Sequence, residues 1–153
     1  NMLICCDYQT KTSERLFEMV DKATKLAKLK CNVKVRMHPA FPLPQELLNQ
    51  YNFKVSKEEM LTALQETDWV ITSNLSAIAV DGYYQGCDIA QLSDGLYCNL
   101  CPLRGVVYEL LFNSADELKQ MFLKQKQQKE SISYFLIDSK IRKWSLILFN
   151  HKT

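Results

Sequence analysis

The chain has 153 residues, of which 47% are hydrophobic, 24% charged and 10% aromatic, and its formal net charge is +2. A chain of this length forms one domain with a substantial core, and its composition excludes disordered, collagenous and coiled-coil proteins. Because so small a net charge builds no concentrated field for nucleic acid or an anionic membrane, the composition predicts no polyanionic partner.

The first third of the chain predicts a strand, a helix and a second strand. Residues 2–6 form a short continuous apolar run, which is typical of a strand buried on both faces of a parallel sheet. From residue 12 the apolar residues follow a helical period, and residues 33–37 then predict a strand that ends at His38 and Pro39. The apolar positions of the helix are Leu16, Met19, Val20, Ala23, Leu26 and Ala27.

The middle of the chain predicts shorter elements. A turn of helix is expected at residues 45–50 and a short strand at residues 53–55. Ser56 and Glu59 have the spacing of a capping box, which predicts the start of another helix. The inner face of that helix is expected to contain Met60, Leu61 and Leu64.

The next strand is predicted at residues 68–72, and the polar residues 73–76 are expected to cap the helix that follows it. Gly86 is predicted to end that helix, and residues 87–92 to form another strand. The remaining predictions are a strand at 106–108, a helix capped by Ser114 and Glu117, a strand at 132–137 and a helix containing Ile141, Trp144 and Leu148. Strands that alternate with helices predict one α/β domain over residues 1–153, a three-layer Rossmann-like domain with a mainly parallel sheet.

The cysteines and the hydropathy bear on the compartment. No apolar run approaches the ~20 residues that span a bilayer, so we expect an intracellular, soluble domain. We expect reduced thiols, with Cys5 and Cys6 on opposite faces of their strand. Cys98 and Cys101 have the spacing of a redox pair or of half a zinc site, but no second pair follows, so we predict no metal and no cofactor.

His38 is the first candidate site residue. Ligands of parallel sheets bind outside the carboxyl ends of the strands, and His38 directly follows the strand predicted at residues 33–37. An imidazole at that edge can donate a hydrogen bond, or a proton, to a phosphate oxygen. The alternative is an ordinary surface histidine. The chain has no GxGxxG motif after its first strand, no Walker lysine loop and no GxSxG motif, so the dehydrogenase, P-loop and hydrolase classes lose their main support.

A second candidate lies where residues 72–76 meet the predicted helix. Hydroxyls and free backbone amides at a helix N-terminus favour an anion such as phosphate, and ordinary capping is the alternative. Asp81, further along the same helix, can accept hydrogen bonds from a ribose or sugar hydroxyl, whereas the alternative is a solvated carboxylate.

His38-Pro39 and the segment 72–86, TSNLSAIAVDGYYQG, together resemble the donor-binding half of two-Rossmann-domain (GT-B) glycosyltransferases of bacterial surface carbohydrates. The similarity is to the sialyltransferase-like and polysialyltransferase-like groups and covers roughly residues 2–148. Asp81 stands where glutamate is more familiar, and Cys87-Asp88 stands where many relatives have Lys-Pro. The resemblance implies that His38 is catalytic and that the nucleotide and its phosphate contact Pro39, Thr72, Ser73, Asn74, Ser76 and Asp81.

The resemblance also implies a function. The domain would bind a CMP-, UDP- or related nucleotide-sugar donor in a metal-independent, inverting glycosyltransferase that builds a capsule or lipopolysaccharide. An N-terminal domain would bind the acceptor glycan, so this domain is not expected to turn over alone. The residue before Met2 is typical of a cloning remnant, which is consistent with a piece of a longer chain. The full-length protein would be cytoplasmic, peripherally associated with the inner face of the membrane, without a nucleic-acid partner. A nucleotide-sugar epimerase-like domain and a non-catalytic α/β interaction module are the alternatives.

Overall fold

The protein is an α/β domain, seen in a computed structural model that describes residues 1–93, 98, 100, 101, 103–105 and 110–124. The strand predicted at residues 106–108 and both elements predicted after residue 131 lie outside these residues. The elements are β1 (Met2–Cys5), α1 (Thr10–Leu26), β2 (Val33–Arg36), α2 (Gln45–Asn49), β3 (Lys54–Val55), α3 (Met60–Gln65), β4 (Trp69–Ser73), α4 (Ile78–Tyr84), β5 (Asp88–Leu92), β6 (Leu111–Phe112) and α5 (Ala115–Leu123).

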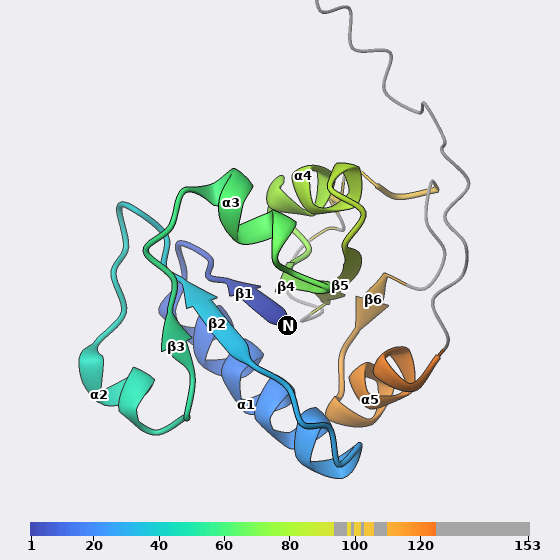
Figure 1. Ribbon diagram of the computed structural model, residues 1–153, viewed down its shortest axis with the longest axis horizontal. Coiled ribbons are helices and arrows are strands. Elements are labelled where there is room, and N and C mark those ends of the chain that lie inside the picture. Colours follow the sequence, from blue (N-terminus) through green and yellow to red (C-terminus); the bar gives the residue numbers. More distant parts are fainter. Residues whose placement is uncertain (94–97, 99, 102, 106–109, 125–153) are drawn as a thin grey trace, which may run out of the picture.

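The six strands form one parallel sheet in the order β3-β2-β1-β4-β5-β6 (Figure 1). This is the strand order of a doubly wound Rossmann sheet, so the prediction of a Rossmann-like α/β fold is confirmed. The chain runs outward from β1 to β3 and then returns to place β4 on the other side of β1. The topological switch point therefore lies between β1 and β4.

Helices cover both faces of the sheet, with α1 and α5 on one face and α3 and α4 on the other (Figure 1). Each face has its own core, because the strand side chains alternate between the two layers. Cys6 belongs to the core on the α1 side and Cys5 to the core on the α3 side, which confirms their predicted placement on opposite faces. Within the described part of the chain, no helix is long and apolar enough to cross a membrane.

The predicted N-terminal caps have different outcomes. Ser114 caps α5 as predicted, since its Oγ accepts a hydrogen bond from the Glu117 amide at 3.2 Å. The predicted box at Ser56 is wrong, because α3 begins at Met60 with Glu59 as its N-cap. The Ser56 hydroxyl instead donates to the Glu58 carboxylate, two residues along the chain, and so is not available to the helix amides.

The start of α4 also differs from the prediction. The polar residues 73–76 do not cap it, because the helix begins at Ile78 and its N-cap, Ala77, makes no side-chain capping bond. The chain first makes a turn after β4, in which the Ser76 amide donates to the Ser73 carbonyl at 3.3 Å. With seven residues, α4 is too short for its dipole to be a strong source of anion affinity.

The C-terminal end of α4 is as predicted. Gly86 has a φ of 82°, the left-handed conformation that glycine adopts without a steric cost. Its amide donates to the Tyr83 carbonyl at 3.0 Å, and the Cys87 amide donates to the Gly82 carbonyl at 2.9 Å. This pair of hydrogen bonds is a Schellman motif, which turns the chain directly into β5.

Candidate functional site

The candidate site lies at the carboxyl ends of β1 and β4, on either side of the switch point. Parallel sheets bind their ligands at this position because the two chain connections diverge there and leave a crevice. Residues 6–9 leave β1 and residues 74–77 leave β4. Four polar side chains on these two segments, or directly beside them, are buried: those of Asp7, Ser13, Ser73 and Asn74.

Ser73 and Asn74 carry polar atoms without partners. Ser73 is 3% exposed and Asn74 is 2% exposed, and neither the Ser73 Oγ nor the Asn74 Nδ2 has a hydrogen-bond partner among the described residues. A buried polar atom left without a partner costs about 1–3 kcal/mol. A ligand oxygen that reached either atom would recover that free energy, and a phosphate or a sugar hydroxyl can accept from each of them.

The loop after β1 is held in shape by Ser13, near the start of α1. The Ser13 Oγ accepts a hydrogen bond from the Asp7 amide at 3.2 Å and donates one to the Gln9 carbonyl at 3.3 Å. Burial raises the pKa of the neighbouring Cys6 thiol to about 12. Cys6 is therefore a neutral packing group at this edge and not a nucleophile.

Thr72 and Gln91 are polar residues inside the sheet near the site. The Thr72 hydroxyl donates to the Cys5 carbonyl at 3.1 Å, so it ties β4 to β1 and is not directed at a ligand. Gln91 is fully buried on β5; its Nε2 donates to the Ser73 carbonyl at 3.1 Å, while its Oε1 has no partner in the described part of the chain. A glutamine inside the apolar run of residues 87–92 is the sequence signal that could have indicated Gln91.

His38 lies at the same edge but on the other side of β1. Since β2 and β4 both pair with β1, His38 and Ser73 are about two strand spacings apart, roughly 10 Å. The half-buried imidazole accepts a hydrogen bond at Nδ1 from the Ala40 amide at 3.3 Å. This bond favours the tautomer with hydrogen on Nε2, which can donate to a ligand. Pro39 is exposed beside it.

Two exposed aromatic rings beside His38 were not anticipated from the sequence. Phe41 is 49% exposed and Tyr8 is 47% exposed. The Phe41 ring centre lies 5.3 Å from that of His38 and 6.3 Å from that of Tyr8. Aromatic residues that follow strand ends, outside any periodic pattern, are the signal that could have located this ring cluster, which offers stacking surface at the ligand edge.

Ser76 and Asp81 are less closely associated with the site. Ser76 is half-buried in the turn after β4, and Asp81 is exposed in the first turn of α4. No hydrogen bond or ion pair joins the Asp81 carboxylate to another described residue. Ser73 and Asn74 are thus consecutive buried residues at the end of β4, His38 lies apart from them across β1, and Asp81 is exposed.

All six cysteines lie in the described part of the chain, and none of them forms a disulfide bond there. Cys98 is exposed, whereas the Cys101 Sγ is buried and accepts a hydrogen bond from the Leu103 amide at 3.3 Å. Among the described residues no group of three or more His, Cys, Asp or Glu side chains is placed to hold a metal ion.

No protein-family model, curated protein or solved structure matches this chain. The fold and the site geometry alone define its class, a Rossmann-like domain with buried neutral polar groups at its switch point.

Proposed function

We propose that this domain binds the nucleotide-sugar donor of a metal-independent glycosyltransferase of surface-polysaccharide biosynthesis and forms the donor half of a two-domain enzyme. The observation that carries the proposal is the pair of buried, unpartnered polar atoms on Ser73 and Asn74 at the switch point. Neutral donors of this kind bind a phosphate oxygen without a metal ion, in the position where Rossmann-like sheets hold ligands.

The other polar residues at the edge take complementary roles in this proposal. Phe41 and Tyr8 offer ring surface for a planar base next to His38, about two strand spacings from the phosphate position. In a diphosphate donor the His38 Nε2–H donates to the phosphate nearer the base, and Ser73 and Asn74 donate to the phosphate that carries the sugar, so both ends of the leaving diphosphate meet a hydrogen-bond donor. Ser76 adds a hydroxyl from the turn after β4. This assignment gives the nucleotide an orientation along the sheet edge from β2 to β4.

Nucleotide titration of the Ser73→Ala variant tests the proposal. We expect CMP or UDP to bind the parent domain at millimolar concentration, because half a cleft encloses little of the ligand. Ser73→Ala should weaken binding about 5-fold, the loss of one neutral hydrogen bond of ~1 kcal/mol. It should also raise the free energy of unfolding by about 1 kcal/mol, because it removes a buried hydroxyl that has no partner. NMR titration and urea denaturation measure the two effects.

Ser56→Ala is the matched control. Ser56 is a serine of similar burial, 7% exposed, but its hydroxyl already donates to the Glu58 carboxylate. We expect Ser56→Ala to lower stability and to leave nucleotide binding unchanged. If no nucleotide shifts the signals of Ser73, Asn74 or His38, or if Ser73→Ala binds as the parent does, the donor site is wrong and an α/β interaction module becomes the better account.

His38→Ala tests the mechanistic half of the proposal in the complete two-domain enzyme. We expect kcat to fall more than the donor KM rises, because His38 meets charge that develops mainly in the transition state. Ser76→Ala should instead raise the donor KM about 5-fold with kcat nearly unchanged, since one neutral hydroxyl contact is worth ~1 kcal/mol. An unchanged kcat for a folded His38→Ala enzyme would make His38 an ordinary surface histidine.

A further inference from the structure

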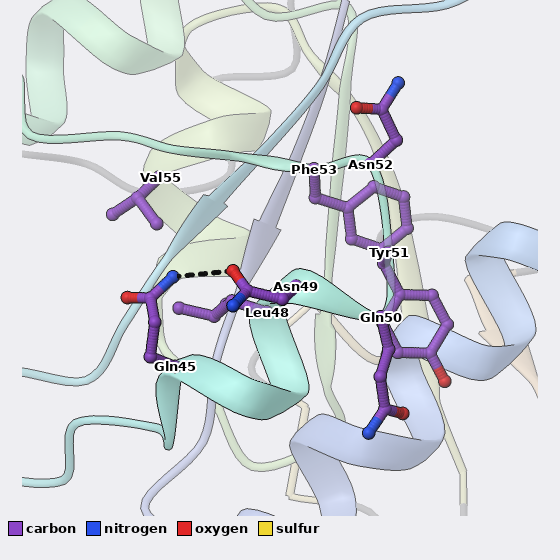
Figure 2. A pocket seen from close by; sticks show the side chains of 8 residues that line it. All are labelled: Gln45, Leu48, Asn49, Gln50, Tyr51, Asn52, Phe53 and Val55. Atoms are coloured by element: carbon purple, nitrogen blue, oxygen red, sulfur yellow. Dashed lines mark hydrogen bonds between the residues drawn. The ribbon is translucent and has the colours of Figure 1, made fainter.

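An open depression of about 530 Å³ lies beside the edge strand β3, between α2 and the segment that joins α2 to β3 (Figure 2). Its volume falls within the roughly 300–1,000 Å³ that ligand pockets occupy. All of its lining residues come from the segment 45–55, away from the residues assigned to the nucleotide. The depression is therefore a separate feature of the molecule.

Four carboxamide side chains line this depression: Gln45, Asn49, Gln50 and Asn52. All four are exposed, and no charged side chain joins them in the lining. The Gln45 Nε2 donates to the Asn49 Oδ1 at 3.0 Å, one turn along α2 (Figure 2). This bond orients the pair and leaves the Gln45 carbonyl oxygen available as an acceptor and the Asn49 NH₂ available as a donor.

Tyr51 and Phe53 form the aromatic wall of the depression (Figure 2). Their ring centres are 5.3 Å apart and the ring planes are inclined by only 14°, so the two rings stack on each other. Phe17 of α1 meets both rings edge-on, with centre distances of 5.7 Å in each case. The wall is thus anchored in the core, and part of each ring face is already covered by the other ring.

A ligand for this depression must match three features: neutral groups that donate and accept, an apolar wall, and the absence of charge in the lining. Each sugar hydroxyl both donates and accepts, as each carboxamide does, and the C–H faces of a sugar ring can pack on the aromatic edges and on Val55. No cationic side chain lines the depression, and the charged groups that act on Tyr51 are mainly the carboxylates of Glu18, Asp21 and Glu14, which disfavour an anion. We infer that this depression is a binding site for a neutral saccharide, distinct from the proposed nucleotide site and independent of it.

NMR titration with lactose, maltose and cellobiose tests the inference. We expect at least one disaccharide to produce saturable shifts of the side-chain NH₂ signals of Asn49 and Asn52 and of the ring signals of Tyr51, with half-saturation in the millimolar range. Sorbitol, which has hydroxyls but no sugar ring, should produce no saturable shift. A response to adenosine without one to the sugars, equal responses to sorbitol and the sugars, or no response at tens of millimolar sugar would each overturn the inference.

Variants of exposed residues locate the site without endangering the core. Asn49→Ala should weaken sugar binding about 5-fold through the loss of one neutral hydrogen bond. Gln65→Ala removes an exposed carboxamide on α3 outside the depression and should leave binding unchanged. Both variants should melt as the parent does. Equal losses in the two variants would overturn the inference, and the nucleotide response of Ser73 and His38 should be unaffected by either variant.

Discussion

Lys28 has a left-handed backbone conformation, which costs a residue with a Cβ atom about 1–2 kcal/mol. It follows α1 with a φ of 53°, and its amide donates to the Lys25 carbonyl at 3.1 Å in a second Schellman motif. We expect Lys28→Gly to raise the free energy of unfolding by about 0.5–1 kcal/mol, since the greater freedom of glycine in the unfolded chain offsets part of the gain. Urea denaturation measures the change.

Lys28→Ala is the control for that substitution. It removes the same charge but keeps the Cβ atom, so it should give no comparable gain. If alanine stabilises the domain as much as glycine does, the loss of charge, and not the backbone conformation, is the cause.

Glu58 carries a pH-dependent contribution to stability. A hydrogen bond from Ser56, followed by one from Lys34, lowers the pKa of the Glu58 carboxyl from 4.5 to about 2. Because the folded-state pKa is the lower one, this stabilisation is present above pH 4.5 and is lost as the pH falls toward 2. We expect Glu58→Gln to be less stable than the parent near neutral pH and to converge with it near pH 2. Thermal melts across this range test the effect.

The neighbouring Glu59 provides the comparison for Glu58. It is exposed, and its carboxylate has no partner among the described residues. Glu59→Gln should therefore follow the parent at every pH. A stability difference between parent and Glu58→Gln that stays constant down to pH 2 would contradict the assignment.

The structure places the polar residues at the end of β4 differently from the prediction. Their hydroxyls were predicted to cap a helix, whereas Ser73 and Asn74 are buried before the helix begins. Local propensity cannot distinguish a capping serine from a buried one, because burial depends on the strands that pack beside it. Tyr8 and Phe41 were missed for a similar reason, since two loops that are distant in sequence meet only in the folded sheet.

At the scale of elements, the packing of α4 depends on Gly82. A Cβ atom at this position would lie 2.9 Å from the Val70 Cγ2 and 3.0 Å from the Ile89 Cδ1. We expect Gly82→Val to lower the free energy of unfolding by about 1–3 kcal/mol, because overpacking forces α4 away from the sheet. Urea denaturation of the variant measures this loss.

A double-mutant cycle tests whether the contact with Val70 is the cause. In a Val70→Ala background, Gly82→Ala should cost less than it does in the parent, because the truncated side chain leaves room for the new methyl group. Equal costs in both backgrounds would show that the contact with Val70 is not limiting.

The long elements were predicted, and so were the short α2 and β3, whereas β6 was not. Every residue of β1 is buried, as its continuous apolar run predicts, and the predicted apolar stripe of α1 includes its buried residues Leu16, Val20 and Ala23. The two-residue strand β6 has too short a pattern to be recognised and is defined only by its pairing with β5. The order of the strands was likewise not predictable, because alternation of strands and helices fixes the class of sheet but not which strands are neighbours.

At the scale of the whole molecule, the reactivity of the cysteine thiols measures how often the domain unfolds. Burial raises the pKa of Cys5 to about 12 and that of Cys6 to about 12, whereas Cys98 is exposed. We expect iodoacetamide to label Cys98 first in the native protein, and Cys5 and Cys6 only at the rate of unfolding. Peptide mass spectrometry over time measures the rates. Labelling of Cys5 as fast as Cys98 would contradict the buried position of β1.

The position of β1 in the sheet has a consequence for synthesis on the ribosome. β1 can pair with β2 as soon as both have emerged, but its other edge waits for β4, which begins at Trp69. The intervening residues, 37–68, take roughly 2–6 s to translate at ~5–20 residues per second. During that interval the most apolar strand of the described sheet has one unpaired edge. A ribosome stall at this stage would therefore favour aggregation of the nascent chain, because an open strand edge can pair with another chain.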